Sequence, residues 1–178
     1  MKNIKLIKNW WSKVVNSGKM FSSLPNDFEV IRKDLFSLEF PVQMGIDERF
    51  LVEAARPKVT NEAKEVKFKN ISTWYKGKTK VEAINITFRD VIGVSVYNKL
   101  DQWQREHTDF ATGKGGYAAT YKKTLILNVE DPTGAVIQKF RLFGAFITSL
   151  DGGDLTMEND EIAMVKMTIQ YDSYRMEF

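Results

Sequence analysis

The feature that most constrains this fold is a repeated two-residue alternation of apolar and polar side chains. It is clearest at residues 84–88 (Ile-Asn-Ile-Thr-Phe), and it returns over 125–129 and 165–171. Because successive side chains of a β-strand point to opposite faces, this pattern predicts strands that bury one face. Weaker alternation predicts further strands over 36–43, 50–54 and 66–69. The chain is therefore expected to be mainly β.

Turn signals show how these strands are joined. Asp131-Pro132-Thr133-Gly134 has a type I turn signature and makes 122–148 a long β-hairpin. The lysine-rich segment 56–80 is longer than a tight turn needs and mixes aromatic with basic residues, which predicts a long hairpin projecting from the domain. The last strand is expected to finish at Tyr171-Asp172.

One internal segment has helical spacing instead. The apolar and aromatic positions recur every three or four residues at Tyr97, Leu100, Trp103 and His107. Ser95 is a suitable N-cap and Thr112-Gly113 a suitable end. The expected architecture is an antiparallel β-barrel or sandwich of about six to eight strands with one flanking α-helix.

The N-terminal residues form a separate pattern, which predicts two parts: an amphipathic arm and linker over 1–26, and the β-domain over 27–178. In the arm, apolar side chains are spaced as on one helix face, at Ile4, Ile7, Trp10 or Trp11, and Val14 or Val15. Lysines interrupt the apolar run, so it is not a signal peptide, and no segment is long and apolar enough to span a membrane. Docking on a partner subunit or on its own domain is favoured over lying on a membrane.

The residues that carry most enzyme chemistry are sparse. The chain has no cysteine and one histidine, His107. Thr112-Gly113-Lys114-Gly115-Gly116 lacks the hydroxyl residue that follows the lysine of a phosphate-binding loop. The carboxylates after residue 150 miss the spacing of a calcium-binding loop. We therefore expect no catalytic residue, no metal site and no cofactor.

Charge is unevenly distributed along the chain. Segment 56–80 has eight basic residues against Glu62 and Glu65, whereas 151–161 has five carboxylates and no lysine or arginine. Opposite patches on one chain suit head-to-tail self-association, although each would also be compatible with a solvated loop. The residues expected at a subunit interface are Lys64, Lys67, Lys69, Trp74, Tyr75, Asp151, Asp154, Glu158, Trp10 and Trp11.

The order of these features resembles the tail tube proteins of contractile-tailed bacteriophages. The opening motif is Arg32-Lys33-Asp34-Leu35-Phe36-Ser37-Leu38-Glu39, followed by the 56–80 hairpin, a strand over 81–89, a helix near 96–110 containing Trp103, the hairpin after Tyr121-Lys122-Lys123, and the ending over 153–172. Each motif is short, and the resemblance rests on their order over about 30–175.

This resemblance implies a structural virion protein. Its subunits would form hexameric rings that stack into the inner tail tube, assembled in the host bacterial cytoplasm. DNA would pass through the lumen when a surrounding sheath contracts, and sheath and baseplate proteins would be the partners. A tube initiator at the baseplate junction and a type VI secretion-like tube subunit that carries effectors are the alternatives.

Overall fold

A computed structural model describes residues 30–158 and 160–177 of the chain. The chain divides into two compact units, Met1–Arg32 and Lys33–Phe178. The second unit contains all of the described strands and helices. Its strands are β1 (Phe36–Glu39), β2 (Leu51–Ala54), β3 (Val59–Phe68), β4 (Ile71–Val81), β5 (Ile84–Arg89), β6 (Lys123–Glu130), β7 (Val136–Asp151), β8 (Met164–Gln170) and β9 (Ser173–Glu177). Its α-helices are α2 (Val96–His107) and α3 (Ala118–Tyr121). Short 3-10 turns occupy Val42–Met44 and Glu48–Phe50.

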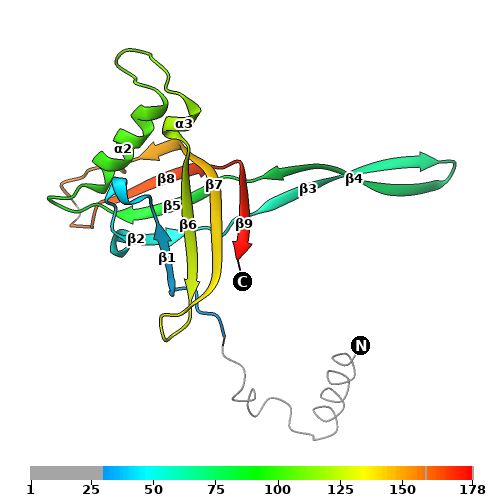
Figure 1. The fold of residues 1–178 in the computed structure, drawn as a ribbon, viewed down its shortest axis with the longest axis horizontal. Coiled ribbons are helices and arrows are strands. Elements are labelled where there is room, and N and C mark those ends of the chain that lie inside the picture. Colours follow the sequence, from blue (N-terminus) through cyan, green and yellow to red (C-terminus); the bar gives the residue numbers. More distant parts are fainter. Residues whose placement is uncertain (1–29, 159, 178) are drawn as a thin grey trace, which may run out of the picture. The chain divides into compact units, whose positions relative to one another are not determined.

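One long strand, β7, belongs to two sheets. Over Lys139–Phe143 it pairs with β9, and over Phe146–Asp151 it pairs with β8. Between these stretches lies Gly144, whose φ of 64° is in the left-handed region that glycine tolerates. The strand order β1-β6-β7-β8-β5-β2 thus runs through a shared bent strand, all pairs antiparallel (Figure 1).

The core lies between the inner faces of these two sheets. Residues of alternating strand positions supply it: Leu38, Leu127 and Leu142 from one sheet, and Ile86, Met167 and Ile169 from the other. Helix α2 contributes Leu100 and Trp103, and the Trp103 indole N–H donates to the Tyr121 carbonyl at 2.7 Å. The predicted N-cap is confirmed, since the Ser95 hydroxyl accepts from the Asn98 N–H at 3.2 Å.

The predicted hairpin over 56–80 is confirmed as β3 and β4, which pair only with each other among the named strands. Figure 1 shows this hairpin extending away from the sandwich as a twisted two-stranded ribbon. The 122–148 hairpin is also confirmed as β6 and β7, and the Gly134 N–H donates to the Asp131 carbonyl at 3.0 Å across its turn.

Several expectations need correction. The sheet path is not closed into a barrel in the described part of the chain, so the sandwich alternative is the correct one. The sandwich has seven strands in the described residues, within the predicted six to eight, and β3 and β4 form the separate projecting hairpin. The last strand was misplaced, because β9 follows the strand that was expected to be last. The helix predicted to reach Thr112-Gly113 ends at His107, and a second short helix, α3, follows it. The arm over 1–26 lies outside the described residues.

Candidate subunit interface

The β3–β4 hairpin has two different faces. Its register pairs Lys64 with Tyr75, Val66 with Thr73 and Phe68 with Ile71. Since cross-strand partners share a face and neighbours along a strand alternate, these side chains lie together. We call this set the apolar strip: Val66, Phe68, Ile71, Thr73 and Tyr75, with Lys64 at its inner end. The opposite face carries Glu65, Lys67, Ser72, Trp74 and Lys76.

The apolar strip has no cover within the described chain. Phe68 is 72 % exposed and Ile71 is 69 % exposed, and Val66 and Tyr75 are also more than half exposed. A two-stranded hairpin without a third strand or a packed face is marginally stable in water. Large apolar side chains gathered on such an element are typical of a surface that another protein covers.

A cluster of polar contacts fixes the root of the hairpin. The Glu82 carboxylate accepts from the Lys58 ammonium group at 2.8 Å and from the Thr60 hydroxyl. The hydrogen bond from Lys58, then that from Thr60, lowers the pKa of Glu82. The Glu82 N–H also donates to the Lys58 carbonyl at 3.0 Å. The hairpin is therefore held where it leaves the sandwich.

A β-bulge interrupts the hairpin midway. Asn61 pairs with Thr79 and Ala63 with Lys76, so one residue on β3, Glu62, opposes two on β4. Bulges increase the local twist of a strand pair. The bulge thus separates the fixed root from the outer part that carries the apolar strip.

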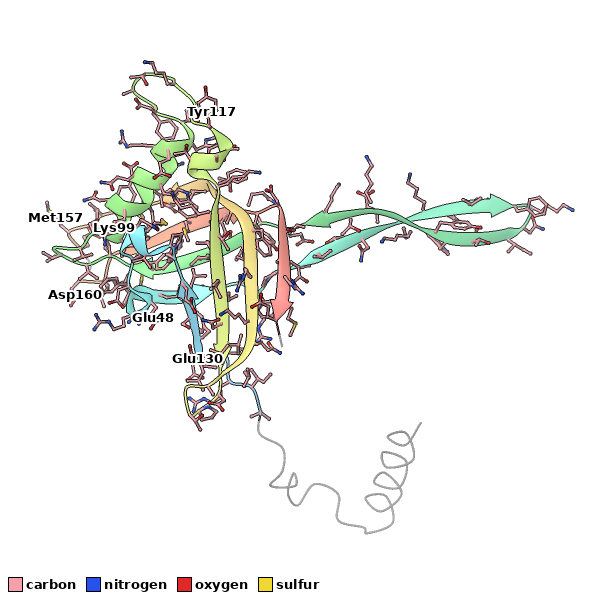
Figure 2. All side chains as sticks on the ribbon, in the orientation of Figure 1. Glu48, Lys99, Tyr117, Glu130, Met157 and Asp160 are labelled. Carbon is pink, nitrogen blue, oxygen red and sulfur yellow. The ribbon has the colours of Figure 1, made fainter. Side chains whose placement is uncertain are left out.

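The acidic segment lies elsewhere in the same unit. Asp151 ends β7, and its carboxylate accepts from the Gly153 N–H at 2.9 Å. Asp154 and Glu158 are exposed in the connection from β7 to β8. In Figure 2, Met157 and Asp160 of this connection lie on the side of the sandwich away from the hairpin.

The structure therefore divides the predicted interface residues into separate groups. Five of them are exposed on the hairpin: Lys64, Lys67, Lys69, Trp74 and Tyr75. Trp74 and Lys67 share one face, whereas Tyr75 belongs to the apolar strip. The three carboxylates lie on the other side of the sandwich, and Trp10 and Trp11 lie outside the described residues.

Sequence reasoning missed the grouping of Phe68 and Ile71 with Tyr75. Strand alternation places Phe68 with Val66, but it does not say which β4 residues face them. The bulge shifts the pairing between Asn61 and Ala63, so the register cannot be extrapolated from the hairpin root. Counting the same number of residues back along β3 and β4 from the hairpin tip would have given the correct pairs.

His107 has a packing role. Its ring lies 4.7 Å from that of Tyr121 and 5.9 Å from that of Phe146, measured between centroids. Its Nδ1 is 2.9 Å from the Thr108 hydroxyl. The glycine-rich segment 112–116 forms the connection from α2 to α3, where the Asp109 carboxylate accepts from the Thr112 hydroxyl at 2.6 Å. These contacts give His107 and the glycine-rich segment structural roles.

Within residues 30–158 and 160–177, no group of three or more His, Asp or Glu side chains is placed to hold a metal ion. In the same part of the chain, no helix has the length and apolar character needed to cross a membrane.

The architecture is shared with proteins of contractile injection machines. One solved chain, from the sheath/tube terminator of the extracellular contractile injection system PVC, is 14 % identical with a TM-score of 0.66, covering 85 % of this chain and 99 % of its own. The tube-terminating cap of the anti-feeding prophage is 15 % identical with a TM-score of 0.66, covering 88 % and 99 %. Hcp1 from Flavobacterium johnsoniae is 12 % identical with a TM-score of 0.51, covering 80 % and 94 %. At these identities the likeness concerns the fold.

The sequence comparison identifies a family. No curated protein matches the chain. A family model described as T4-like virus tail tube protein gp19 matches residues 36–175, from the first residue of β1 into β9. That range includes both sheets, the hairpin and both α-helices. The family is one of tail tube proteins, in agreement with the resemblance found in the motifs. The chain belongs to the T4-like virus tail tube protein family.

Proposed function

We propose that this chain self-assembles into stacked hexameric rings that form the inner tail tube of a bacteriophage. The tube would be the conduit through which DNA leaves the particle when the sheath contracts. Assembly would take place in the host bacterial cytoplasm, and the partners would be sheath and baseplate proteins. Membership of the tail tube family supports this role.

The single observation that carries the proposal is the exposed hairpin. It projects from the sandwich and bears large apolar side chains together with the lysines Lys64, Lys67 and Lys69. A surface of this kind gains stability only when another protein covers it. In a self-assembling tube that protein is another copy, so Lys64, Lys67, Lys69, Trp74 and Tyr75 are proposed as contact residues. Trp10 and Trp11 are proposed as a second contact, from the N-terminal arm.

A tube-end role is the second candidate. The similar structures include a sheath/tube terminator and a tube-terminating cap, each with a TM-score of 0.66, against 0.51 for Hcp1. A subunit of this kind, like a tube initiator at the baseplate, would form a ring without repeating along the tube. A type VI-like tube that carries effectors is the third, supported by the fold shared with Hcp1.

Negative-stain electron microscopy of the purified chain tests these roles. Tubes many rings long, with a central channel, are expected for the repeating subunit. Single rings that do not stack would favour the tube-end role. A compact monomer at high protein concentration, measured by sedimentation velocity, would contradict self-assembly. Sheath protein added to preformed tubes should form a second, outer layer if the tube belongs to a contractile particle.

A further inference from the structure

Two connections meet on the side of the sandwich away from the hairpin. The segment 90–95 leads from β5 into α2, and 152–163 leads from β7 to β8. They are held together where the Asp90 N–H donates to the Ala163 carbonyl at 3.0 Å. Gly152 lies against the Tyr97 ring of α2, so closely that a β-carbon there would be 2.9 Å from a ring carbon. The two connections thus form one surface.

This surface is rich in exposed apolar side chains. Ile92 and Met157 are fully exposed, and Leu155 is 90 % exposed. Val94 is 44 % exposed and Ile162 is 63 % exposed. Ile92, Leu155 and Met157 contribute little to the core of the described unit, because they leave nearly all of their area in water. Their concentration on two adjoining connections marks a second uncovered apolar surface.

The same surface carries a strong negative charge. Its carboxylates are Asp90, Asp151, Asp154, Glu158, Asp160 and Glu161. Residues 90–95 and 151–163 contain no lysine or arginine. The hairpin has the reverse character, with six lysines against two glutamates over Val59–Val81. These two apolar surfaces, both uncovered in the described part of the chain, are therefore opposite in charge.

We propose that the surface formed by 90–95, 151–158 and 160–163 is the receptor for the hairpin of a second copy of this chain. The apolar strip would pack against Ile92, Leu155, Met157 and Ile162. Lys64, at the inner end of the strip, and Lys69, which lies over the Phe68 ring, would face the carboxylates. Apolar contact supplies the burial, and charge complementarity fixes the pairing and excludes two hairpins from meeting. This inference rests on the proposed self-assembly and names the partner surface.

The receptor belongs to a different copy because of where the two surfaces lie. Figure 2 shows Met157 and Asp160 on the opposite side of the sandwich from the hairpin, which extends away from it. The root of the hairpin is fixed by the Glu82 contacts, so it does not fold back across the sandwich. Each copy therefore offers one hairpin and one receptor, a heterologous contact.

Disulfide trapping tests this pairing directly, because the chain has no native cysteine. Three single-cysteine variants are made at exposed hydroxyl residues: Thr73→Cys in the apolar strip, Thr156→Cys in the receptor, and Thr133→Cys in the β6–β7 turn as a matched control. A fourth, Ser12→Cys, places the thiol in the N-terminal arm. Pairs are mixed, assembled and oxidised, and disulfide-linked dimers are counted on non-reducing gels.

Thr73→Cys is expected to link to Thr156→Cys at least tenfold more than to Thr133→Cys. Equal linking to both, or no link to Thr156→Cys within assembled particles, would overturn the receptor. So would preferential linking of Thr156→Cys to Ser12→Cys, which would make the arm its occupant. These outcomes are read only on assembled material, so failure of wild-type protein to assemble contradicts the proposed function separately.

A charge exchange gives an independent readout. Asp154→Lys with Glu158→Lys is expected to reduce assembly at least tenfold, and combining it with Lys64→Glu and Lys69→Glu to restore most of it. Circular dichroism confirms that each variant is folded. Wild-type assembly by the receptor variant alone would overturn the pairing while leaving self-assembly intact.

Discussion

Gly77 of β4 lies directly against the backbone of Glu62 on β3: a β-carbon at Gly77 would be 2.8 Å from the Glu62 carbonyl oxygen. The close approach occurs at the bulge, where one residue opposes two. Because the neighbouring atoms are the Glu62 carbonyl group and its β-carbon, no rotation of the Glu62 side chain relieves the overlap. Glycine at this position sets the direction of the outer hairpin.

Gly77→Ala is therefore expected to disrupt the hairpin without unfolding the sandwich. Relieving the overlap should cost on the order of 1–3 kcal/mol of hairpin stability. Since about 1.4 kcal/mol is tenfold in an equilibrium constant, the concentration needed for assembly should rise roughly tenfold or more. Sedimentation measures assembly. Lys78→Ala, at the next position, is the control and should assemble at the wild-type concentration, whereas the thermal unfolding of the sandwich should be unchanged in both variants.

Reversing charge at Lys67 and Lys69 should impair assembly while leaving the subunit folded. Both side chains are exposed on the outer hairpin, and Lys69 also lies over the Phe68 ring at 5.6 Å. Assembly of the wild type should weaken with added salt, since about 0.15 M screens charges beyond roughly 8 Å. Lys114→Glu, in the exposed connection between the helices, is the matched control. Normal tubes from Lys67→Glu/Lys69→Glu would remove these lysines from the interface.

Gly144→Ala should destabilise the sandwich itself. Its φ of 64° disfavours a side chain, and a β-carbon there would overlap the Asp172 carboxylate, which binds Lys122 at 2.8 Å. A residue forced into the left-handed region costs about 1–2 kcal/mol, equivalent to a fall in Tm of roughly 2–8 °C. Gly115→Ala is the control, because the nearest atom would be 3.9 Å away. Equal Tm values for the two variants would contradict this role of Gly144.

The hairpin root should loosen in acid. The hydrogen bond from Lys58, and then that from Thr60, lowers the pKa of Glu82 below its ordinary value of 4.5. A lowered pKa in the folded state means that the contribution to stability is complete above about pH 4.5 and is lost as the pH falls through the folded-state value. Chemical shifts of Thr60 against pH report the transition. Glu82→Gln should abolish it, whereas Glu65→Gln on the outer hairpin should preserve it.

Assembly should protect the outer hairpin from hydrogen exchange. In the free subunit its amides have one partner strand and almost no buried side chains, so they should exchange far faster than those of β6. Covering the apolar strip should slow the exchange at Val66 and Thr73 by at least tenfold. Amides of the 131–135 turn serve as the internal control. Unchanged exchange at the hairpin in assembled tubes would exclude it from the interface.

The sequence was most informative where a strand buries one face completely. Residues 84–88 alternate because Ile84, Ile86 and Phe88 all enter the core. The strand predicted over 81–89 is found at Ile84–Arg89, with its end correct and its start three residues late. Strand β9 escaped prediction because its side chains are mostly exposed, and it is ordered by pairing with a distant strand, β7. Helix α3 is four residues long, too short to show a period.

The candidate interface was predicted in part. Residue counts located the basic hairpin and the acidic connection, because charge is visible without a fold. The apolar component of the receptor was not visible: Ile92 is far from Met157 in sequence, and only the pairing of β5 with β8 brings their connections together. The residue pattern of 71–81 does not show which of these residues share a face across the whole hairpin, because the bulge shifts their pairing with β3.

The placement of hairpin and receptor on opposite sides of one sandwich has a consequence for mixed populations. A subunit whose outer hairpin is deleted keeps its receptor, so it still accepts a neighbour but cannot engage the next. Such a subunit would be a dominant inhibitor of assembly. Once incorporated into a growing particle, it would block extension at its hairpin side and leave its receptor side open. A minor fraction co-expressed with wild type would then shorten particles dominantly, whereas a subunit lacking both surfaces would be ignored.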